Sequence, residues 1–279
     1  EGGYYSVEHG DTYVAVINFS NTATPIKDAA AWLIKDAAKS DATWKILCMH
    51  QPPYYTNNGG NEPVYEAIPD AAEAAGIDVV FSGHDHTWAV TNPLVDDKID
   101  EDNGILYYIV GAAGSKRYSP VTQDKFDYNT IFRKVGEPYT ATYLRISSNK
   151  DEMRIDVYDT VKGLLDTATI QSECKKGGHK NIYDSSSEKT TCTVCGTVST
   201  DYTGAVSDND GNEYYLINGK IKTGWYPVGE EQRYYGENGI RENVTMEETA
   251  STCIVDGFAI YTSESGATLK VNYIDAGGH

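Results

Sequence analysis

Between residues 13 and 81, short apolar stretches alternate with alanine-rich ones, and this alternation restricts the chain to few folds. Three stretches are strand-sized and rich in β-branched or other apolar residues: 13–19, 45–49 and 77–81. The two stretches between them have helical composition and begin at or near a proline: 25–39 and 63–75. Strands separated by helices of this length predict an α/β core with parallel strands.

The composition changes twice along the rest of the chain. Four further runs read as β-strands: 105–110, 139–146, 154–158 and 164–170. After Ile170 the sequence is rich in Ser, Thr, Gly, Lys and Tyr and holds no long apolar run. A chain of 279 residues exceeds the size at which one hydrophobic core keeps growing, so we expect several domains.

The charge of the chain excludes some partners. The formal net charge is −18, and the calculated isoelectric point is near 4.6. Such a field repels nucleic acid and anionic ligands unless bound cations reverse it locally, so a phosphate-handling site needs metal. No apolar run approaches the ~20 residues of a membrane helix, and we expect no membrane span.

Three histidines stand directly after predicted strands. His50 follows the run 45–49, and His84 and His86 follow Gly83 after the run 77–81. Ligands of α/β folds bind at the carboxyl ends of the strands, and neutral imidazole binds zinc, iron and manganese. For His50 alone a surface or core role is the better interpretation; the combination favours a metal site, with Gly83 providing the tight turn.

Four motifs in order resemble the C-terminal half of calcineurin-like metallophosphoesterases, most closely purple acid phosphatases. They are Tyr-Tyr-Ser-Val-Glu-His-Gly-Asp at 4–11, Lys-Ile-Leu-Cys-Met-His-Gln-Pro-Pro-Tyr at 45–54, Ser-Gly-His-Asp-His at 82–86 and Tyr-Ile-Val-Gly-Ala-Ala-Gly at 108–114. The resemblance implies a β-sandwich half flanked by helices. It also implies that His50 and His84 bind one metal of a dinuclear centre (iron, zinc or manganese) and His86 the other. Two metals then hold a phosphate ester while an activated water attacks phosphorus in line.

The sequence departs from this family in three ways. The other metal ligands of the family lie in an Asp motif, a Gly-Asp motif and a Gly-Asn-His motif, and this chain has none of these motifs. We expect them N-terminal to Glu1. The chain is therefore interpreted as an incomplete fragment of low activity. Gly59 and Gly60 replace a histidine pair of the plant members, and no general acid is assigned. After the last histidine the family often has Tyr-Glu-Arg, whereas this chain has Trp88, Ala89 and Val90. The specificity pocket is therefore not assigned. Asp85 is expected to orient a histidine or to be solvated.

Cysteine is concentrated in one short segment. The spacing Cys-x4-His-x12-Cys-x2-Cys is formed by Cys174, His179, Cys192 and Cys195. It has the ligand number and type of a structural zinc site, and the segment resembles short zinc-ribbon-like repeats of surface proteins from gut Firmicutes. A Cys192–Cys195 disulfide or uncoordinated thiols are the alternatives. A degenerate copy, with Cys253 but with Ser263 and Ser265 in place of thiols, is expected at 249–279 and should bind no metal.

Aromatic residues and glycines dominate residues 201–248. Asn-Gly pairs predict two β-hairpins there. The segment resembles choline- or glucan-binding repeats, in which aromatic pairs stack on quaternary ammonium groups or sugars. The candidate aromatics are Trp225, Tyr226, Tyr234 and Tyr235. The equally supported alternative is that they form the core of a small β module.

Together these features predict four segments: 1–172 (metallophosphoesterase half), 173–200 (zinc-ribbon-like), 201–248 (cell-wall-binding-like) and 249–279 (degenerate copy). The expected protein hydrolyses phosphate esters at the surface of, or secreted from, a Gram-positive bacterium, with a cell-wall polymer as a further partner. The alternative is a non-catalytic wall-attached protein that uses the phosphoesterase half as a scaffold.

Overall fold

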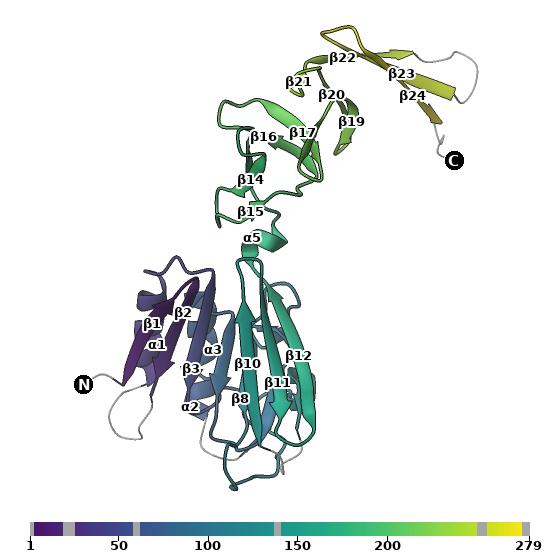
Figure 1. Ribbon diagram of the computed structural model, residues 1–279. Helices are drawn as coiled ribbons and strands as arrows, with labels where there is room; N and C mark the ends of the chain where they lie inside the picture. Colours follow the sequence, from purple (N-terminus) through teal and green to yellow (C-terminus); the bar gives the residue numbers. More distant parts are fainter. Residues whose placement is uncertain (1–2, 19–25, 58–61, 137–140, 250–255, 275–279) are drawn as a thin grey trace. The chain divides into compact units, whose positions relative to one another are not determined.

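The computed structural model describes residues 3–18, 26–57, 62–136, 141–249 and 256–274, without the side chains of 246–249, 256–259 and 272–274. The chain forms two compact units, Glu1–Lys176 and Gly177–His279 (Figure 1). The expected boundaries at 172, 200 and 248 stay predictions. In the described part of the chain, no helix is both long and apolar enough to cross a membrane.

A seven-stranded sheet is the centre of the first unit. Its order is β1-β2-β3-β4-β8-β5-β9, with bounds Tyr4–His9, Thr12–Ile17, Trp44–Met49, Val79–Ser82, Leu106–Val110, Trp88–Thr91 and Phe132–Val135. The pairs β2–β3, β3–β4 and β4–β8 are parallel, which confirms the parallel core predicted from the strand–helix alternation. The outer pairs β1–β2, β5–β8 and β5–β9 are antiparallel.

Helices cover one face of this sheet. The stretch predicted as one helix at 63–75 forms two, so the helix bounds are α1 Ile26–Ala37, α2 Glu62–Tyr65 and α3 Ile68–Ala75. The single-helix prediction is wrong because Pro69 lacks an N–H and stands in the first turn of α3, where a helix begins. Gly76 caps α3 with a left-handed φ of 65°. Leu33, Ile68 and Leu47 pack between helices and sheet, where they are shielded from water.

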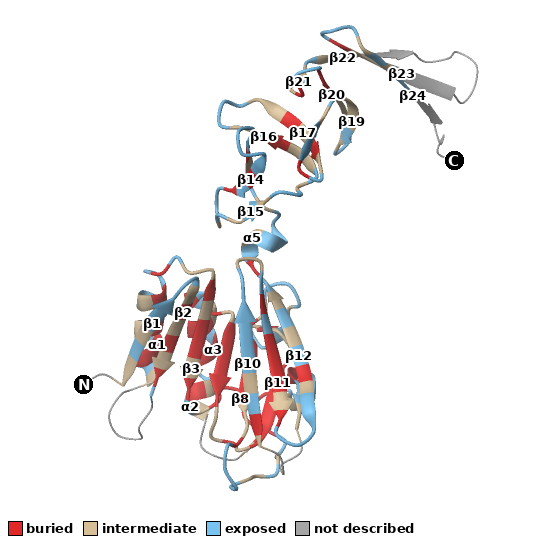
Figure 2. Cartoon of the chain, viewed as in Figure 1, coloured by how far each residue is buried: buried red, intermediate tan, exposed pale blue. Residues whose placement is uncertain are grey.

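A second sheet covers the opposite face. It contains β10 (Thr142–Ser148), β11 (Glu152–Asp159) and β12 (Gly163–Gln171) in antiparallel order. Met153, Ile155 and Val157 of β11 have no exposed surface and pack in one cluster with Trp44 and Phe81 of the first sheet. Figure 2 shows these inner strands buried, whereas much of β10 is exposed. The resulting β-sandwich with helices on one side agrees with the predicted architecture.

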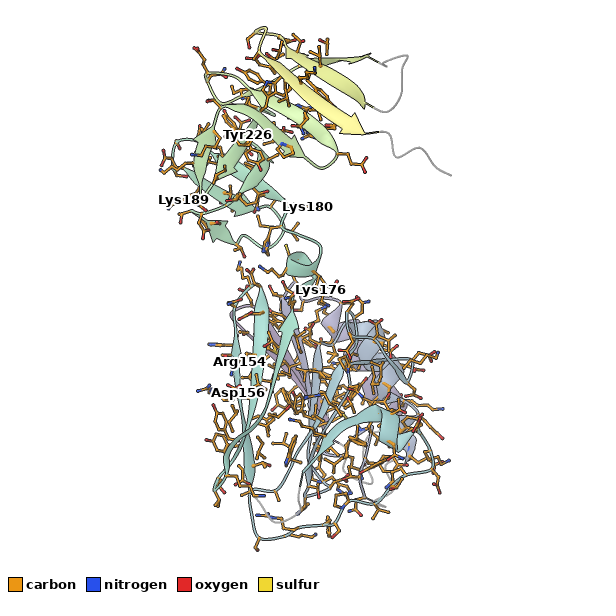
Figure 3. All side chains as sticks on the ribbon, turned by 90° about the vertical axis from the view of Figure 1, so that its right-hand side faces the viewer. Arg154, Asp156, Lys176, Lys180, Lys189 and Tyr226 are labelled. Carbon is orange, nitrogen blue, oxygen red and sulfur yellow. The ribbon has the colours of Figure 1, made fainter. Side chains whose placement is uncertain are left out.

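On the outer face of β11, charged side chains form a ladder. Asp156 accepts hydrogen bonds from Arg145 Nη2 at 2.7 Å and from Arg154 Nε at 2.9 Å, and Arg154 and Asp156 can be followed in Figure 3. The remaining short elements of this unit are β6 (Leu94–Val95), β7 (Lys98–Ile99), α4 (Tyr128–Ile131) and α5 (Glu173–Lys176).

The described part of the second unit is built from β-strands. A six-stranded sheet has the order β15-β14-β13-β16-β17-β18, with bounds Val198–Ser199, Lys189–Cys192, Asn181–Asp184, Gly204–Ser207, Glu213–Ile217 and Lys220–Lys222. Two three-stranded sheets follow: β19 (Gly224–Val228), β20 (Glu231–Tyr235), β21 (Arg241–Glu242), and β22 (Val244–Thr249), β23 (Asp256–Ser263), β24 (Thr268–Ile274). The predicted Asn-Gly turn joins β17 to β18, with left-handed φ of 50° at Asn218 and 72° at Gly219.

The segment expected as a degenerate copy contains the β23–β24 hairpin. Ser263 and Ser265 lie in its turn, whereas Cys253 and the terminal Gly-Gly-His lie outside the described residues. Its relation to the first cysteine segment stays a prediction.

Candidate metal centre

The parallel strands β3 and β4 bring two histidine segments together. His50 directly follows Met49, the last residue of β3, and His84 stands two residues after the end of β4. Gly83 N–H donates to the carbonyl of His50 at 2.9 Å, so the two backbones stay joined beyond the strands. Because both strands point the same way, their carboxyl ends meet at one edge of the sheet.

The imidazoles of His50 and His84 lie edge to face at that edge. His84 Nδ1 is 3.3 Å from His50 Nε2, and the ring planes meet at 84°. Two nitrogens bound to one tetrahedral ion at about 2.1 Å each stand about 3.4 Å apart. The 3.3 Å between His84 Nδ1 and His50 Nε2 agrees with this value. The role of the pair as metal ligands stays a prediction.

The backbone after β4 is strained at the histidines. His84 and His86 have φ of 66° and 53°, a left-handed conformation that residues other than glycine seldom adopt. We expected Gly83 to provide the turn, but Gly83 is outside the left-handed region. That prediction is wrong, and the conformational cost falls on His84 and His86, as is frequent at functional sites.

His86 is oriented by a backbone carbonyl. Its Nδ1 lies 2.9 Å from the carbonyl oxygen of Lys116, and its ring packs on Tyr118 with centroids 5.0 Å apart. A carbonyl oxygen only accepts, so Nδ1 carries a proton, and in the neutral ring Nε2 has the lone pair. Metal-binding histidines show the same arrangement, in which one nitrogen donates to the protein and the other is the ligand.

Asp85 lies between these histidines in sequence but has another partner. Its side chain has no exposed surface, and Oδ2 accepts hydrogen bonds from Thr56 N–H at 2.6 Å and from the Thr56 hydroxyl at 3.1 Å. The expectation that Asp85 orients a histidine or is solvated is therefore wrong. Burial raises the pKa of Asp85 to about 6, against these hydrogen bonds. No sequence signal pointed to Thr56 or to the Lys116 carbonyl as supports of the site.

The electrostatics around His50 favour its neutral imidazole. Burial lowers the pKa of His50, with further lowering by His84 and His86 and an opposing effect of Asp85. A neutral ring offers the lone pair that a cation requires. The donors present therefore fit part of a metal centre: two imidazoles that converge and a third with its Nε2 available.

Among the described residues, no carboxylate completes a cluster of metal ligands with His50, His84 and His86. Asp78 precedes β4 and so stands at the other strand end, where its Oδ2 accepts Lys45 N–H at 2.7 Å. Among the described residues, three or more His, Cys, Asp or Glu ligand atoms converge within 4.8 Å only in the cysteine segment. Carboxylates balance the charge of paired cations, so these histidines alone are an incomplete site.

The predicted zinc ligands do come together. Cys174, His179, Cys192 and Cys195 each place a ligand atom within 4.8 Å of all the others. The alternative disulfide between Cys192 and Cys195 is not formed in the structure.

The candidate aromatic residues divide into two kinds. Tyr235 has no exposed surface, which favours a packing role for it. Tyr226 stacks on Tyr215 with centroids 4.3 Å apart and planes 14° apart (Tyr226 is labelled in Figure 3), and Trp225 packs on Tyr234 at 5.2 Å. Trp225, Tyr226 and Tyr234 are half-buried, and their ligand-binding role stays a prediction.

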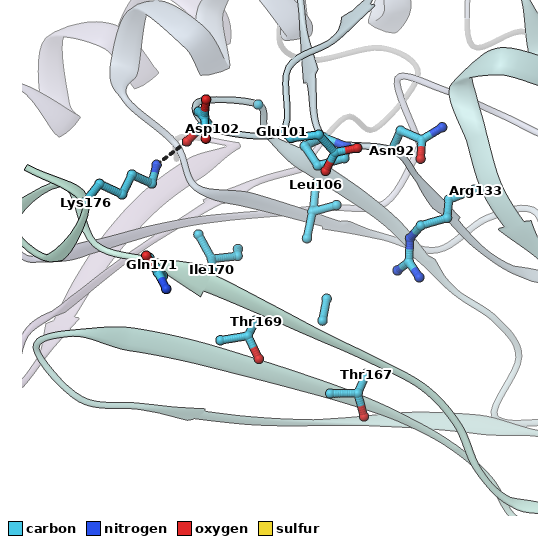
Figure 4. A pocket seen from close by; sticks show the side chains of 13 residues that line it. Asn92, Glu101, Asp102, Leu106, Arg133, Thr167, Thr169, Ile170, Gln171 and Lys176 are labelled. Atoms are coloured by element: carbon cyan, nitrogen blue, oxygen red, sulfur yellow. Dashed lines mark hydrogen bonds between the residues drawn. The ribbon is translucent and has the colours of Figure 1, made fainter. Parts of the chain in front are cut away.

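Trp88 and a cavity nearby do not define a substrate pocket. Trp88 is buried and belongs to the core between the two sheets. A cavity of about 410 Å³ lies beside β12 (Figure 4), but its cations already have partners. Arg133 donates to Asp166, and Lys176 donates to the carbonyl of Asp102. None of its lining residues is a histidine.

Comparisons with known proteins agree with the resemblance. Residues 1–88, which include all three site histidines, match the Calcineurin-like phosphoesterase family. Purple acid phosphatase 21 of Arabidopsis thaliana is 29% identical over 119 residues, 40% of this chain and 27% of that protein; Purple acid phosphatase 18 is 29% identical over 120 residues, with the same shares. A purple acid phosphatase from yellow lupin seeds aligns with a TM-score of 0.47 at 17% identity, over 60% of this chain and 32% of that one.

Residues 1–88 are therefore similar to calcineurin-like phosphoesterases, and the relatives of this part of the chain include purple acid phosphatases. This similarity implies a dinuclear metal centre. The chain spans about a quarter of the length of the curated relatives it matches.

Proposed function

We propose that this chain provides the histidine side of a metal centre that hydrolyses phosphate esters. The observation that carries the proposal is the 3.3 Å approach of His84 Nδ1 to His50 Nε2 at the carboxyl ends of β3 and β4, inside the segment that matches the family. His50 and His84 share one cation, and His86, held by the Lys116 carbonyl, binds the second through Nε2.

Residues of this chain hold and orient the metal-binding histidines. The left-handed backbone at His84 and His86 places both residues in the bend after β4. Asp85, anchored by Thr56, fixes the loop between them. Cations bound here would polarise the phosphoryl oxygens and lower the pKa of an attacking water. They would also neutralise the repulsion between a phosphate ester and a chain of net charge −18.

The test is reconstitution of activity. The 279-residue chain is joined to a polypeptide with the Asp, Gly-Asp and Gly-Asn-His motifs of the family, and p-nitrophenyl phosphate hydrolysis is measured with iron, zinc or manganese. We expect metal-dependent turnover that His50→Ala or His84→Ala lowers at least about 100-fold, because loss of a residue that only orients a metal ligand already costs about 10–100-fold. His9→Ala, on the exposed end of β1, is the matched control. Turnover that is equal in all three variants contradicts the proposal, and no turnover in any of them favours the non-catalytic scaffold.

We further propose that the protein acts at a Gram-positive cell surface and binds a wall polymer. The support is the resemblance of residues 201–248 to choline- or glucan-binding repeats and the half-buried, paired rings of Trp225 and Tyr234. Isolated walls should retain the chain, and Trp225→Ala should lose retention, whereas Tyr5→Ala, at an exposed ring of the first unit, should keep it. Retention unaffected by Trp225→Ala favours the packing role instead.

A further inference from the structure

Four metal-binding side chains converge in residues 174–195. The ligand atoms of Cys174, His179, Cys192 and Cys195 all lie within 4.8 Å of one another. His179 Nδ1 is 3.4 Å from Cys195 Sγ. A sulfur at about 2.3 Å and a nitrogen at about 2.1 Å from one tetrahedral zinc stand about 3.6 Å apart. The distances therefore fit ligands of a single ion.

A tight turn presents two of the thiols. Cys192 ends β14, its N–H donates to the carbonyl of Thr197 at 2.9 Å, and Gly196 N–H donates back to the carbonyl of Cys192 at 2.9 Å. Gly196 has a φ of 71°, which a glycine adopts without steric cost. Thr193 N–H donates to the carbonyl of Lys180 at 2.9 Å, which ties the turn to the residue after His179. Lys180 is labelled in Figure 3.

The chemistry of the donors selects the metal. Three thiolates and one imidazole prefer zinc to the hard cations magnesium and calcium, and four ligands complete its coordination. Cys195 Sγ is 3.2 Å from Thr197 Oγ1, a distance at which the hydroxyl can donate to a thiolate and stabilise its charge. Cys192 is 1% exposed, so water has little access to that ligand.

The surrounding sheet has little else to order it. Its described cluster of buried apolar side chains is small: Tyr183, Val206, Tyr214 and Leu216, with Tyr202 and Ile240 packed against it. A core of this size stabilises a domain weakly, and small domains of this kind commonly depend on a metal or disulfides. Among the described cysteines none forms a disulfide.

We propose that Cys174, His179, Cys192 and Cys195 bind one structural zinc ion, and that this ion orders β13, β14 and the turn after them. The zinc site has no part in the hydrolysis proposed for His50, His84 and His86. It takes a single ion that no substrate reaches, because all four positions are filled by the protein.

A serine turn elsewhere in the second unit provides an internal contrast. Ser263 N–H donates to the carbonyl of Ala267 at 2.9 Å, and Gly266, with a φ of 85°, donates to Ser263. The hydroxyls of Ser263 and Ser265 meet at 3.0 Å. A similar reversal is therefore closed by hydroxyls, without the thiolates that zinc prefers.

Cobalt substitution tests the site on the full chain. With Co²⁺ in place of zinc, we expect thiolate-to-cobalt charge-transfer absorption and the intense visible bands of tetrahedral cobalt. Cys192→Ser and Cys195→Ser should lose both. His179→Cys should keep them, because a fourth thiolate preserves tetrahedral binding. Cys48→Ala, at a half-buried thiol of β3, is the matched cysteine control and should keep them, as should His84→Ala. No charge-transfer absorption in the unmodified chain overturns the proposal, as does unchanged absorption in Cys192→Ser.

The ordering role has its own measurement, which does not depend on a variant folding. Amide hydrogen exchange is followed before and after chelation of the purified, zinc-loaded chain. Amides of Cys192 and Thr193 should exchange at least about tenfold faster after zinc removal, whereas amides of β11 in the first unit should not change. Equal exchange of β14 with and without zinc overturns the ordering role.

Discussion

The buried carboxylate of Asp85 accepts two hydrogen bonds from Thr56, one from its backbone N–H at 2.6 Å and one from its hydroxyl at 3.1 Å. This contact joins the loop after β3 to the loop after β4, the two segments that carry His50 and His84. The Thr56–Asp85 contact therefore fixes the two loops that carry the histidine pair.

Removal of the Thr56 hydroxyl should weaken this anchor. Thr56→Val keeps the backbone donor but loses the second hydrogen bond to a buried carboxylate, and we expect a loss of about 1–2 kcal/mol in the free energy of unfolding. Urea denaturation followed by circular dichroism measures the change. Thr160→Val, at an exposed threonine, should change stability by less than about 0.5 kcal/mol. Equal effects of the two substitutions contradict the anchoring role.

Asp78 should make the first unit less stable as the pH rises. Burial raises its pKa to about 6, although Lys45 N–H opposes the shift, whereas an unfolded aspartate has a pKa of about 3.9. The folded state thus binds this proton more tightly. The associated stability is fully present below about pH 4 and is lost as the pH rises through about 6.

Asp78→Asn keeps an oxygen acceptor for Lys45 N–H and removes the charge. We expect it to raise the free energy of unfolding at about pH 7 by up to about 2 kcal/mol, with a smaller gain at about pH 4.5. Asp124→Asn, at an exposed position, is the control. A gain that is larger at the lower pH would show the opposite sign of linkage.

The parallel core could be predicted from sequence because strand and helix periods differ and Pro and Gly mark element ends. The convergence of His50 and His84 followed from one rule, that neighbouring parallel strands end at the same edge. The grouping of Cys174, His179, Cys192 and Cys195 was predicted separately, from their spacing in the sequence.

Other features depended on tertiary contacts. The division of residues 62–75 into α2 and α3 was missed because the alanine-rich composition concealed the effect of Pro69. Thr56 and the Lys116 carbonyl are separated from their partners by 29 and 30 residues, and no local pattern links them to the histidines. The left-handed backbone at His84 and His86 could not be predicted either, because residues other than glycine adopt it too seldom for residue type to indicate the position.

Tyr235 should behave as a core residue. Its side chain is fully buried, and its hydroxyl donates to Glu213 at 2.7 Å. Tyr235→Phe should cost about 1 kcal/mol through the lost hydrogen bond, since Arg233 still pairs with Glu213. Tyr235→Ala should cost about 3–5 kcal/mol through the cavity. Unfolding of the second unit monitored by tyrosine fluorescence tests both; little effect of Tyr235→Ala would contradict a core role.

The 279-residue chain by itself should be a poor phosphatase. Carboxylates balance paired cations during phosphoryl transfer, and none joins the histidines in the described structure. Hydrolysis of p-nitrophenyl phosphate with added manganese, zinc or iron should therefore stay near the rate of the metal alone. Robust metal-dependent turnover would show that the catalytic ligands lie elsewhere in the chain.

Metal binding by individual histidines shows whether His50 and His84 share one ion. Zinc is titrated into the isotopically labelled chain while the imidazole nitrogen resonances are followed by NMR, with His179 reporting the cysteine site separately. We expect the resonances of His50 Nε2 and His84 Nδ1 to shift together at one zinc concentration, while His9 does not respond. A His9 response equal to that of His50, or no response of His84 at any zinc concentration, would contradict a metal centre at the ends of β3 and β4.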